Sequence, residues 1–175
     1  MSDVPEGTQA HRAEARRTAA MRAAVLTVSD SRTPETDESG RYLREALAAA
    51  GHAVQAHDLL PNDEGRVRAR LEEWLARGDL DLVVITGGTG LGSRDRTIEV
   101  VRPLLEKELP GFGELFRMLG FQEQVGPAAM LSRATAGSAR GVFVVSLPGS
   151  RAACELAMTR LILPEAPHAI RELRR

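Results

Sequence analysis

The stretch that decides the fold spans residues 82–97 and reads LVVITGGTGLGSRDRT. A short apolar run comes first, a glycine-rich loop follows, and a helix-like segment begins near Thr97, which predicts a strand, a loop and a helix start. Glycine lacks a Cβ atom, so several backbone N–H groups of such a loop can converge on one point, and a helix N-terminus adds partial positive charge behind them. The pattern therefore predicts a site for a phosphate or a nucleotide.

The loop matches neither of two well-known glycine motifs. It has no Gly-Lys-Ser or Gly-Lys-Thr ending, and Ser93 stands where a G-x-G-x-x-G motif counted from Gly88 needs its third glycine. An acid, Asp95, follows five residues after Gly90. A carboxylate beside a phosphate cradle is unfavourable unless a divalent cation lies between them, so Asp95 is a candidate metal ligand. A simpler interpretation is that Asp95 only caps the next helix and the glycines only form a tight turn.

The rest of the chain alternates between two periodicities. Apolar runs predict strands at 23–28, 54–60, 82–85, 132–136 and 141–147. Amphipathic spacing predicts helices at 38–50, 67–78, 98–105, 112–121 and 151–161. A hairpin-like turn at 137–140 separates the last two strands. The alternation predicts a doubly wound α/β fold, with a mostly parallel sheet, helices on both faces and a small hairpin.

Polar residues follow three of the predicted strands at the points where those strands end. In a doubly wound sheet, ligands gather at the carboxyl ends of the strands. We therefore expect one cleft lined by Ser29, Asp30, Gly87, Gly88, Thr89, Gly90, Asp95, Pro148, Gly149 and Ser150. Taken singly, Ser29 and Asp30 are typical of a plain turn, and Ser150 is typical of a helix N-cap.

Composition adds bounds on the class of protein. A chain of 175 residues favours one domain, which we expect at 22–175 behind a flexible or weakly helical arm at 1–21. The net charge is only -1, with 23 basic and 24 acidic residues, which disfavours a nucleic-acid partner. The single cysteine, Cys154, excludes an internal disulfide, and no apolar stretch is long enough to span a membrane. We expect a cytoplasmic protein.

Four separated blocks of sequence point in order to one family. They are residues 86–97, LPGFGELFRML at 109–119, LSR at 131–133 and LPGS at 147–150. On these blocks the chain resembles the MoaB/MogA family of molybdenum-cofactor biosynthesis proteins, and the block after Gly111 is more similar to the MoaB branch. The likeness runs from near Ala23 to about Pro164. It implies a molybdopterin adenylyltransferase, which uses Mg-ATP to place AMP on the terminal phosphate of molybdopterin.

The resemblance also implies roles for individual residues. Asp95 matches the family's acid in the Arg-Asp-x-Thr position, and we assign it to catalysis and to Mg²⁺. Residues 87–90 are expected to cradle a phosphate, and Thr97 to hold a phosphate oxygen or to cap the helix. Ser132, with Arg133, is expected to face the pterin phosphate, although Arg133 could equally be a surface ion pair.

Two positions depart from the family pattern. In active adenylyltransferases of the MogA type, a second essential Asp comes directly after a Pro in the loop after the second strand, whereas here Asn62 follows Pro61. Spacing to the downstream apolar residues puts Asn62 at the family position. Asp63, one residue later, is kept as the candidate second catalytic acid. Gly120 stands where many relatives have a Ser near the pterin site.

These departures leave two alternatives to the enzyme. One is a molybdopterin-binding protein of the same pathway without transferase activity, and the other is an oligomeric interaction scaffold. The resemblance implies a homo-oligomer, either a trimer or a hexamer. Its interface could bury the apolar set Phe112, Leu115, Phe116, Leu119 and Phe121, which could instead pack within one subunit. Molybdopterin, ATP and a molybdenum-insertion protein of the same pathway are the expected partners.

Overall fold

The structure is a computed structural model that describes residues 20–175. Its centre is one six-stranded sheet, whose strands are β1 (Arg22–Val28), β2 (Ala53–Leu60), β3 (Leu82–Thr86), β4 (Lys107–Glu108), β5 (Thr135–Ala139) and β6 (Val142–Leu147). The strand order is β2-β1-β3-β6-β5-β4. Strands β2, β1, β3 and β6 are parallel, while β5 and β4 run antiparallel to their neighbours. The mostly parallel α/β sheet that the sequence predicts is confirmed.

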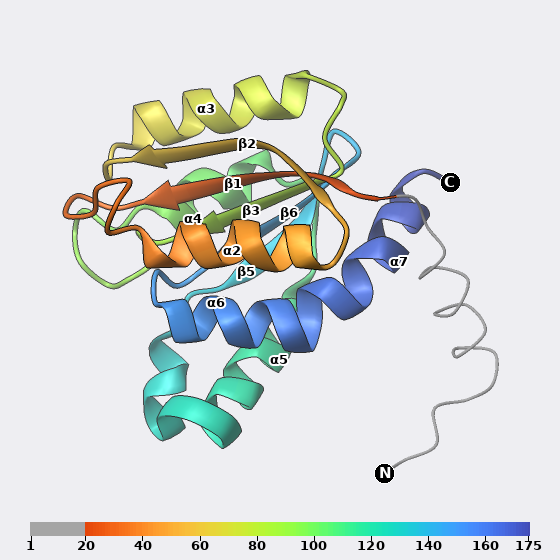
Figure 1. Ribbon diagram of the computed structural model, residues 1–175. Coiled ribbons are helices and arrows are strands. Elements are labelled where there is room, and N and C mark those ends of the chain that lie inside the picture. The colour runs from red at the N-terminus through yellow and green to blue at the C-terminus, as the bar shows by residue number, and fades with distance from the viewer. Residues whose placement is uncertain (1–19) are drawn as a thin grey trace, which may run out of the picture.

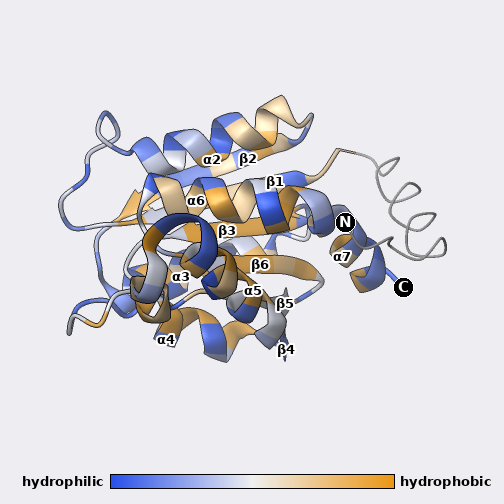
Figure 2. Cartoon of the chain, turned by 90° about the horizontal axis from the view of Figure 1, so that it is seen from below, coloured by the Kyte–Doolittle hydropathy of each residue, from blue (hydrophilic) through white to orange (hydrophobic). Residues whose placement is uncertain are grey.

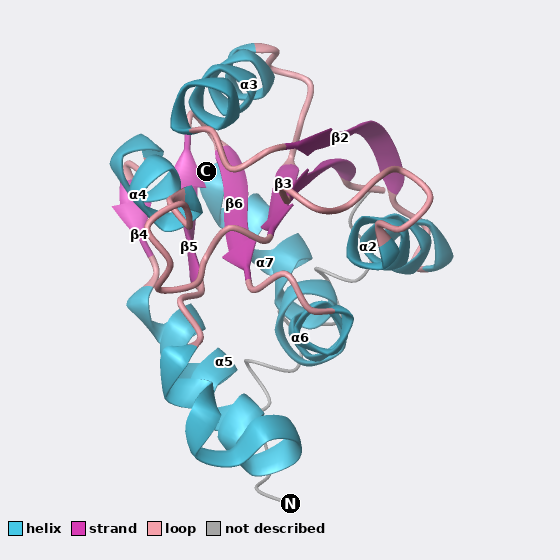
Figure 3. Cartoon of the chain, turned by 90° about the vertical axis from the view of Figure 1, so that its left-hand side faces the viewer, coloured by secondary structure: helices cyan, strands magenta, loops and turns pink. Residues whose placement is uncertain are grey.

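Helices cover both faces of this sheet, as Figures 1 and 3 show. They are α2 (Glu38–Ala49), α3 (Glu64–Ala76), α4 (Thr97–Val101), α5 (Pro110–Gly120), α6 (Arg151–Ala157) and α7 (Leu163–Leu173). Helices α3 and α4 enclose one apolar core against the sheet. Helices α2, α5, α6 and α7 enclose a second core on the opposite face. Because both faces are covered, the central strands are hydrophobic throughout and not in alternation, as the orange strands in Figure 2 show.

The hairpin between β5 and β6 differs from the predicted one. The turn consists of Arg140 and Gly141, whose φ angles of 49° and 77° are both positive, as a two-residue type I′ connection requires. Strand β5 consequently starts three residues later than the predicted 132–136. Gly137, expected in the turn, lies inside β5, where a Cβ atom would overlap the Lys107 carbonyl of β4. This glycine permits close strand approach and does not form the turn.

Two helix ends also differ from prediction. The helix predicted for 98–105 ends at Val101 and continues only as a 3₁₀ turn at Arg102–Leu104 that contains Pro103. The last helix does not stop near 161, because a π-helical turn at Met158–Ile162 leads directly into α7. Pro164 occupies the first turn of α7, directly after the π-helical turn. Buried side chains, Ala166 and Ile170 among them, then attach α7 to the core.

Met21, the last residue of the predicted N-terminal arm, packs against the rest of the chain. Met21 is 2% exposed, and its carbonyl accepts a hydrogen bond from the Ala53 N–H at the start of β2. The N-terminal arm predicted for 1–21 otherwise lies outside the described residues. Over residues 20–175, no helix has both the length and the apolar character needed to cross a membrane.

Candidate functional site

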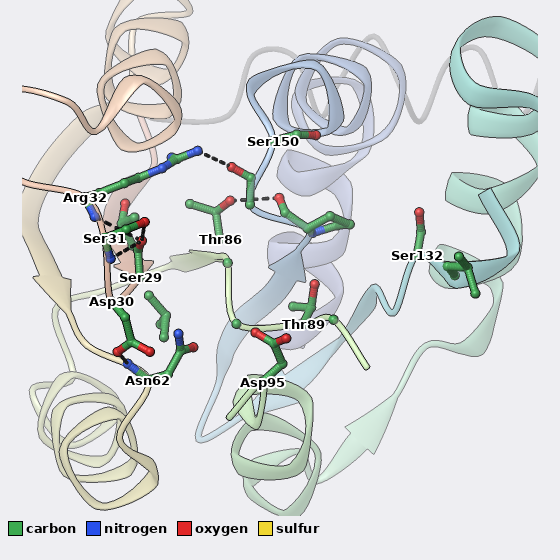
Figure 4. Close-up of a pocket in the computed structure, with 18 residues that line it drawn as sticks. Ser29, Asp30, Ser31, Arg32, Asn62, Thr86, Thr89, Asp95, Ser132 and Ser150 are labelled. Carbon is green, nitrogen blue, oxygen red and sulfur yellow. Dashed lines mark hydrogen bonds between the residues drawn. The ribbon is translucent and has the colours of Figure 1, made fainter. Parts of the chain in front are cut away.

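Loops at the carboxyl ends of β1, β3 and β6 surround a cleft of about 670 Å³ (Figure 4). In the sheet, β2 lies on one side of β1 and β3 on the other, so the order of the strands reverses at β1. The cleft lies at this point of reversal. The structure brings eleven predicted residues together there: Ser29, Asp30, Gly87, Gly88, Thr89, Gly90, Asp95, Ser132, Pro148, Gly149 and Ser150. Loops that are far apart in sequence thus form a single site.

The glycine-rich loop presents backbone donors to this cleft. Among the described residues, the N–H groups of Gly88, Thr89 and Gly90 have no acceptor, and the same holds for Gly149 and Ser150 on the facing loop. Buried N–H groups are nearly always paired in folded proteins, and of these residues Thr89 is buried, Gly88 and Gly149 are half-buried, and Gly90 and Ser150 are exposed. Unpaired donors that line one cleft therefore favour an anionic ligand, which supplies the missing acceptors.

Two glycines of the loop are required by its geometry. Gly87 has φ of +95°, and a Cβ atom there would overlap the Val28 carbonyl of β1. Gly88 has φ of +62°, and a Cβ atom there would overlap Thr97 Oγ1 and lie 2.5 Å from Asn62 Oδ1. Residues that carry a side chain rarely adopt such φ values. The sequence therefore uses glycine both for the turn and for close approach to β1 and α4.

Asp95 lies beside this loop with its carboxylate available. A Cβ atom at Gly90 or Gly92 would come within 2.8 Å of Asp95 Oδ2, so the carboxylate lies directly against the loop. No described residue donates a hydrogen bond to that carboxylate, and its backbone N–H bonds the Gly92 carbonyl at 3.0 Å. The side chain does not cap α4, since the residue before that helix is Arg96 and has no side-chain cap bond. The capping interpretation of Asp95 is therefore wrong.

The residues of the cleft fit a Mg²⁺ ion that is shared with a bound phosphate group. Within residues 20–175, no three His, Cys, Asp or Glu side chains come together as a metal site. Mg²⁺ commonly binds through one or two carboxylates, with water and substrate phosphates completing its shell. One free carboxylate, Asp95, beside a cradle for phosphate matches that pattern.

Asp30 connects three loops at the rim of the cleft. Its Oδ1 accepts hydrogen bonds from the Asn62 N–H at 2.9 Å and from Arg94 at 3.1 Å, and its Oδ2 pairs with Arg94 Nε at 2.9 Å. The Asn62 N–H and the Arg94 guanidinium hold the pKa of Asp30 below its usual value. Asp30 is therefore charged at neutral pH and joins the loops after β1, β2 and β3.

Arg133 supports the glycine-rich loop from behind. It donates to the carbonyls of Thr89 at 2.8 Å and Asp95 at 3.2 Å, and it forms a two-pronged ion pair with Glu99 on α4. The hydrogen bonds from Arg133 hold the pKa of Glu99 below its usual value. Arg133 is not among the residues lining the cleft, so its guanidinium orders the loop and does not face the cleft.

Comparison with known proteins agrees with this geometry. A family model described as "Probable molybdopterin binding domain" matches residues 24–168. The chain belongs to that family. It is 47% identical over 163 residues to molybdenum cofactor biosynthesis protein B of Halalkalibacterium halodurans, covering 93% of this chain and 95% of the relative. The family expected from the sequence blocks is confirmed.

Solved structures of the family share the fold. A crystal structure of molybdenum cofactor biosynthesis protein B superposes with a TM-score of 0.87 at 45% identity, covering 90% of this chain and 98% of that one. The tungsten cofactor synthesizing protein MoaB of Pyrococcus furiosus superposes with a TM-score of 0.80 at 38% identity, and the match covers 90% of this chain and 99% of that one. The chain is thus a member of the MoaB/MogA family of molybdenum-cofactor biosynthesis proteins.

In this family member, the loop after β2 directs Asn62 and not Asp63 into the cleft. Asn62 lines the cleft, as Figure 4 shows. Asp63 does not line it: its Oδ1 accepts the Arg66 N–H at 2.8 Å and caps α3. Thr97, the first residue of α4, is likewise outside the cleft. Thr97 Oγ1 and Asn62 Oδ1 are buried without a partner among the described residues, and both lie close to the point that a Cβ atom of Gly88 would occupy.

Several residues around the cleft were not found from the sequence. Arg32 and Thr86 line it and bind the loop after β6: Arg32 Nη2 donates to the Gly149 carbonyl at 2.8 Å, and Thr86 Oγ1 donates to the Pro148 carbonyl at 2.9 Å. Asp37, buried behind them, caps α2 by accepting the Gly40 N–H. An Asp just before a helix is a recognisable cap signal, but nothing in the sequence shows that Arg32 also reaches it.

Proposed function

We propose that the protein catalyses the Mg-ATP-dependent adenylylation of molybdopterin. The observation that carries this proposal is the Asp95 carboxylate, free of protein hydrogen bonds and lying against a loop of unpaired N–H groups in one cleft. The cleft volume of about 670 Å³ is within the range typical of small-molecule sites. The family name supports molybdopterin as the ligand.

The reaction forms one phosphoanhydride bond and breaks another. An oxygen of the molybdopterin phosphate attacks the α-phosphorus of ATP, and the bond to the β-phosphate oxygen breaks, so pyrophosphate leaves with the electron pair of that bond. Both reactants are anions, and their repulsion must be offset. When bound, Mg²⁺ neutralises part of that charge and orients the phosphates.

The residues of the cleft supply the rest of the catalysis. The N–H groups of Gly88, Thr89 and Gly90 donate to phosphate oxygens, and they stabilise charge that grows on the transferred group. Asp95 holds the metal–nucleotide complex on the loop. Because Arg133 fixes the Thr89 and Asp95 carbonyls, the donors are arranged before the ligand arrives, which lowers the entropic cost of alignment. No protein nucleophile is needed.

A molybdopterin-binding protein without transferase activity is the second candidate. The observation that favours it is the loop after β2, which places an amide, Asn62, in the cleft and uses the acid Asp63 as a helix cap. If the reaction needs a second acid there, this chain binds molybdopterin and transfers AMP slowly. The two candidates share the ligand and differ only in turnover.

The proposal extends to the oligomeric state of the protein and to its place in the cell. We infer a cytoplasmic homo-oligomer, a trimer or a hexamer, that passes its product to a molybdenum-insertion protein. Large apolar side chains exposed on α5 and the turns after it support assembly: Leu115, Met118, Phe121, Val125, Met130 and Leu131. Of the predicted apolar set, Phe116 is instead buried within the subunit. A scaffold role without ligand remains the third candidate, and it does not explain the unpaired donors of the cleft.

The decisive experiment follows AMP transfer from α-labelled Mg-ATP to molybdopterin under anaerobic conditions. We expect Asp95→Asn to lower the transfer rate by about 10²-fold or more, as removal of a key electrostatic group does. Asp79→Asn is the control, because this acid pairs with Arg77 near the opposite end of β3. Equal rates in Asp95→Asn and in wild type would overturn the assignment of Asp95 to the metal.

The same assay separates the two candidates. Slow transfer by a wild-type protein that binds molybdopterin, together with faster transfer by Asn62→Asp, would support the second candidate, a molybdopterin-binding protein without transferase activity. Asp63→Ala should remove the α3 cap and lower stability by about 1 kcal/mol with little effect on transfer. Abolished transfer in a folded Asp63→Ala protein would restore Asp63 as a catalytic acid.

A further inference from the structure

A buried carboxylate lies behind the cleft and is not part of its lining. The Asp37 side chain is 1% exposed, and its Oδ2 accepts a hydrogen bond from Thr27 Oγ1 at 2.7 Å. Its Oδ1 accepts the Gly40 N–H at 2.9 Å and Arg32 Nη1 at 3.3 Å, and His57 Nε2 lies 3.5 Å from Oδ2. Burial of a charge is unfavourable, and the four groups around this carboxylate offset that cost.

The sequence places a glycine, Gly40, next to this carboxylate, although glycine does not favour a helix. Gly40 lies in the first turn of α2, and glycine is a poorer helix former than alanine. A Cβ atom at Gly40 would overlap the Asp37 carboxylate, and it would lie 2.5 Å from Thr27 Oγ1 and 2.9 Å from His57 Nε2. The glycine is therefore required by Asp37 and its partners, independently of the hydrogen bonds themselves.

Arg32 connects Asp37 to the loop after β6. One guanidinium nitrogen contacts Asp37 Oδ1, and another donates to the Gly149 carbonyl at 2.8 Å, a bond drawn in Figure 4. Ser39 Oγ, completely buried in α2, donates to the same carbonyl at 2.8 Å. Gly149 itself packs tightly, because a Cβ atom there would lie 3.2 Å from the Gly87 Cα. The loop after β6 is thus held by the start of α2.

Peptide geometry converts this contact into an orientation of donors. A trans peptide is planar, and its C=O and N–H point in opposite directions. Bonds to the Gly149 carbonyl therefore fix the direction of the Ser150 N–H, and the bond from Thr86 to the Pro148 carbonyl fixes the Gly149 N–H in the same way. Both N–H groups belong to residues that line the cleft, and neither has an acceptor among the described residues.

We propose that Asp37 is a positioning residue, which holds Arg32 on the Gly149 carbonyl and thereby presents the Ser150 N–H to an anionic group of the ligand. The ordering of the loop is a property of the free protein. The consequence for the ligand rests on the proposed function, in which both substrates carry phosphate. A second donor pair, facing the glycine-rich loop, thus depends on a residue that never contacts the ligand.

A second buried carboxylate provides a matched control. Asp81 is 4% exposed and accepts hydrogen bonds from Arg22 and Arg174 at the opposite end of β3. Loss of its charge should destabilise the fold without changing the cleft. Asp37→Asn and Asp81→Asn therefore separate a general effect of removing a buried charge from a specific effect on the loop after β6.

The direct test is ¹⁵N relaxation of the Gly149 and Ser150 amides in the ligand-free protein, measured well below the melting temperature. We expect order parameters of about 0.85 in wild type and in Asp81→Asn, and clearly lower values in Asp37→Asn and Arg32→Gln, in which Ser39 alone still holds the Gly149 carbonyl. Arg32 is 27% exposed, so Arg32→Gln tests the same connection if Asp37→Asn fails to fold. Unchanged order parameters in both variants would overturn the proposal.

Calorimetry with Mg-ATP adds the functional readout. Asp37→Asn and Arg32→Gln should each weaken binding about tenfold or more, the effect expected for one hydrogen bond to a charged group, and the double variant should be no weaker than either single one. Additive losses would show that Asp37 does not act through Arg32 and would also overturn the proposal. A wild-type protein that does not bind Mg-ATP would contradict the proposed function, while the relaxation data would still decide the role of Asp37.

Discussion

Substitution of Gly87 by alanine tests the geometry on which the cleft depends. Gly87 is the first residue after β3, its φ is +95°, and its N–H bonds the Leu147 carbonyl of β6 at 3.0 Å. A Cβ atom there would overlap the Val28 carbonyl of β1. This neighbour is backbone at the end of β1, a strand paired on both sides, so it cannot move aside as a flexible side chain would.

The magnitude follows from two separate contributions. A non-glycine residue in the left-handed region costs about 1 kcal/mol, and overpacking against a fixed neighbour adds about 1–3 kcal/mol. The matched control is Gly51→Ala, because Gly51 has φ of +82° and open space around its Cβ position. For a chain of this size each 1 kcal/mol lowers the melting temperature by roughly 2–4 °C. We expect a loss of about 2–4 °C for Gly51→Ala and about 4–16 °C for Gly87→Ala.

Thermal unfolding and Mg-ATP calorimetry together check this prediction. Gly87→Ala should also weaken Mg-ATP binding, because relief of the contact with Val28 displaces the adjoining Gly88 and Thr89 donors, whereas Gly51→Ala should bind normally. Equal melting temperatures for the two variants would refute the reasoning, since the backbone overlap would then contribute nothing. Normal binding by a destabilised Gly87→Ala protein would show that the loop is only a turn.

Three further predictions concern the rest of the molecule. Burial opposes ionisation of Asp81, but hydrogen bonds from Arg22 outweigh this effect and lower the pKa of Asp81 to about 2, compared with 3.8 in the unfolded chain. The charged side chain should therefore contribute about 2 kcal/mol to the free energy of unfolding above pH 4, and this contribution should be lost as the pH falls towards 2. Acid titration of unfolding free energy should show this slope in wild type and not in Asp81→Asn. Burial raises the pKa of Cys154 to about 11, so an aromatic disulfide reagent at pH 8 should react at least about 100-fold more slowly with native than with urea-unfolded protein, and equal rates would contradict the structure. Arg133→Gln should weaken Mg-ATP binding about tenfold, because it releases the Thr89 carbonyl. Glu99→Gln should have a similar effect, because Glu99 holds Arg133 in place. Normal affinity in both variants would show that this ion pair does not support the loop.

The sequence predicted most of the fold because its central strands are unambiguous. Continuous apolar runs identified β1, β3 and β6, and glycines at φ above zero marked the loops between elements. The β5–β6 hairpin was misplaced because Gly137 resembles a turn residue, although its role is to let β4 approach. The extension of the last helix into α7 was missed because Pro164 indicates a stop unless it falls in a first turn.

The site was predictable as a set of loops and not as a network of contacts. Topology alone places the carboxyl ends of β1, β3 and β6 together, which is why ten of the eleven expected residues line one cleft, the other being Ser132 before β5. Contacts between distant segments have no local signal. The bond from Arg32 to Gly149 spans 117 residues, and the two roles of Asn62 and Asp63 depend on where α3 begins. These features emerge only from the packed structure.

Pyrophosphate release from Mg-ATP, measured with and without molybdopterin, tests the central claim most directly. If the unpaired donors of the cleft and the Asp95 carboxylate bring the two phosphates together, the wild-type protein should release one pyrophosphate for each AMP joined to molybdopterin. Release should require both Mg²⁺ and the pterin, and it should fall by about 10²-fold or more in Asp95→Asn. A folded protein that binds molybdopterin yet releases no pyrophosphate under these conditions would contradict the claim that this cleft is an adenylylation site.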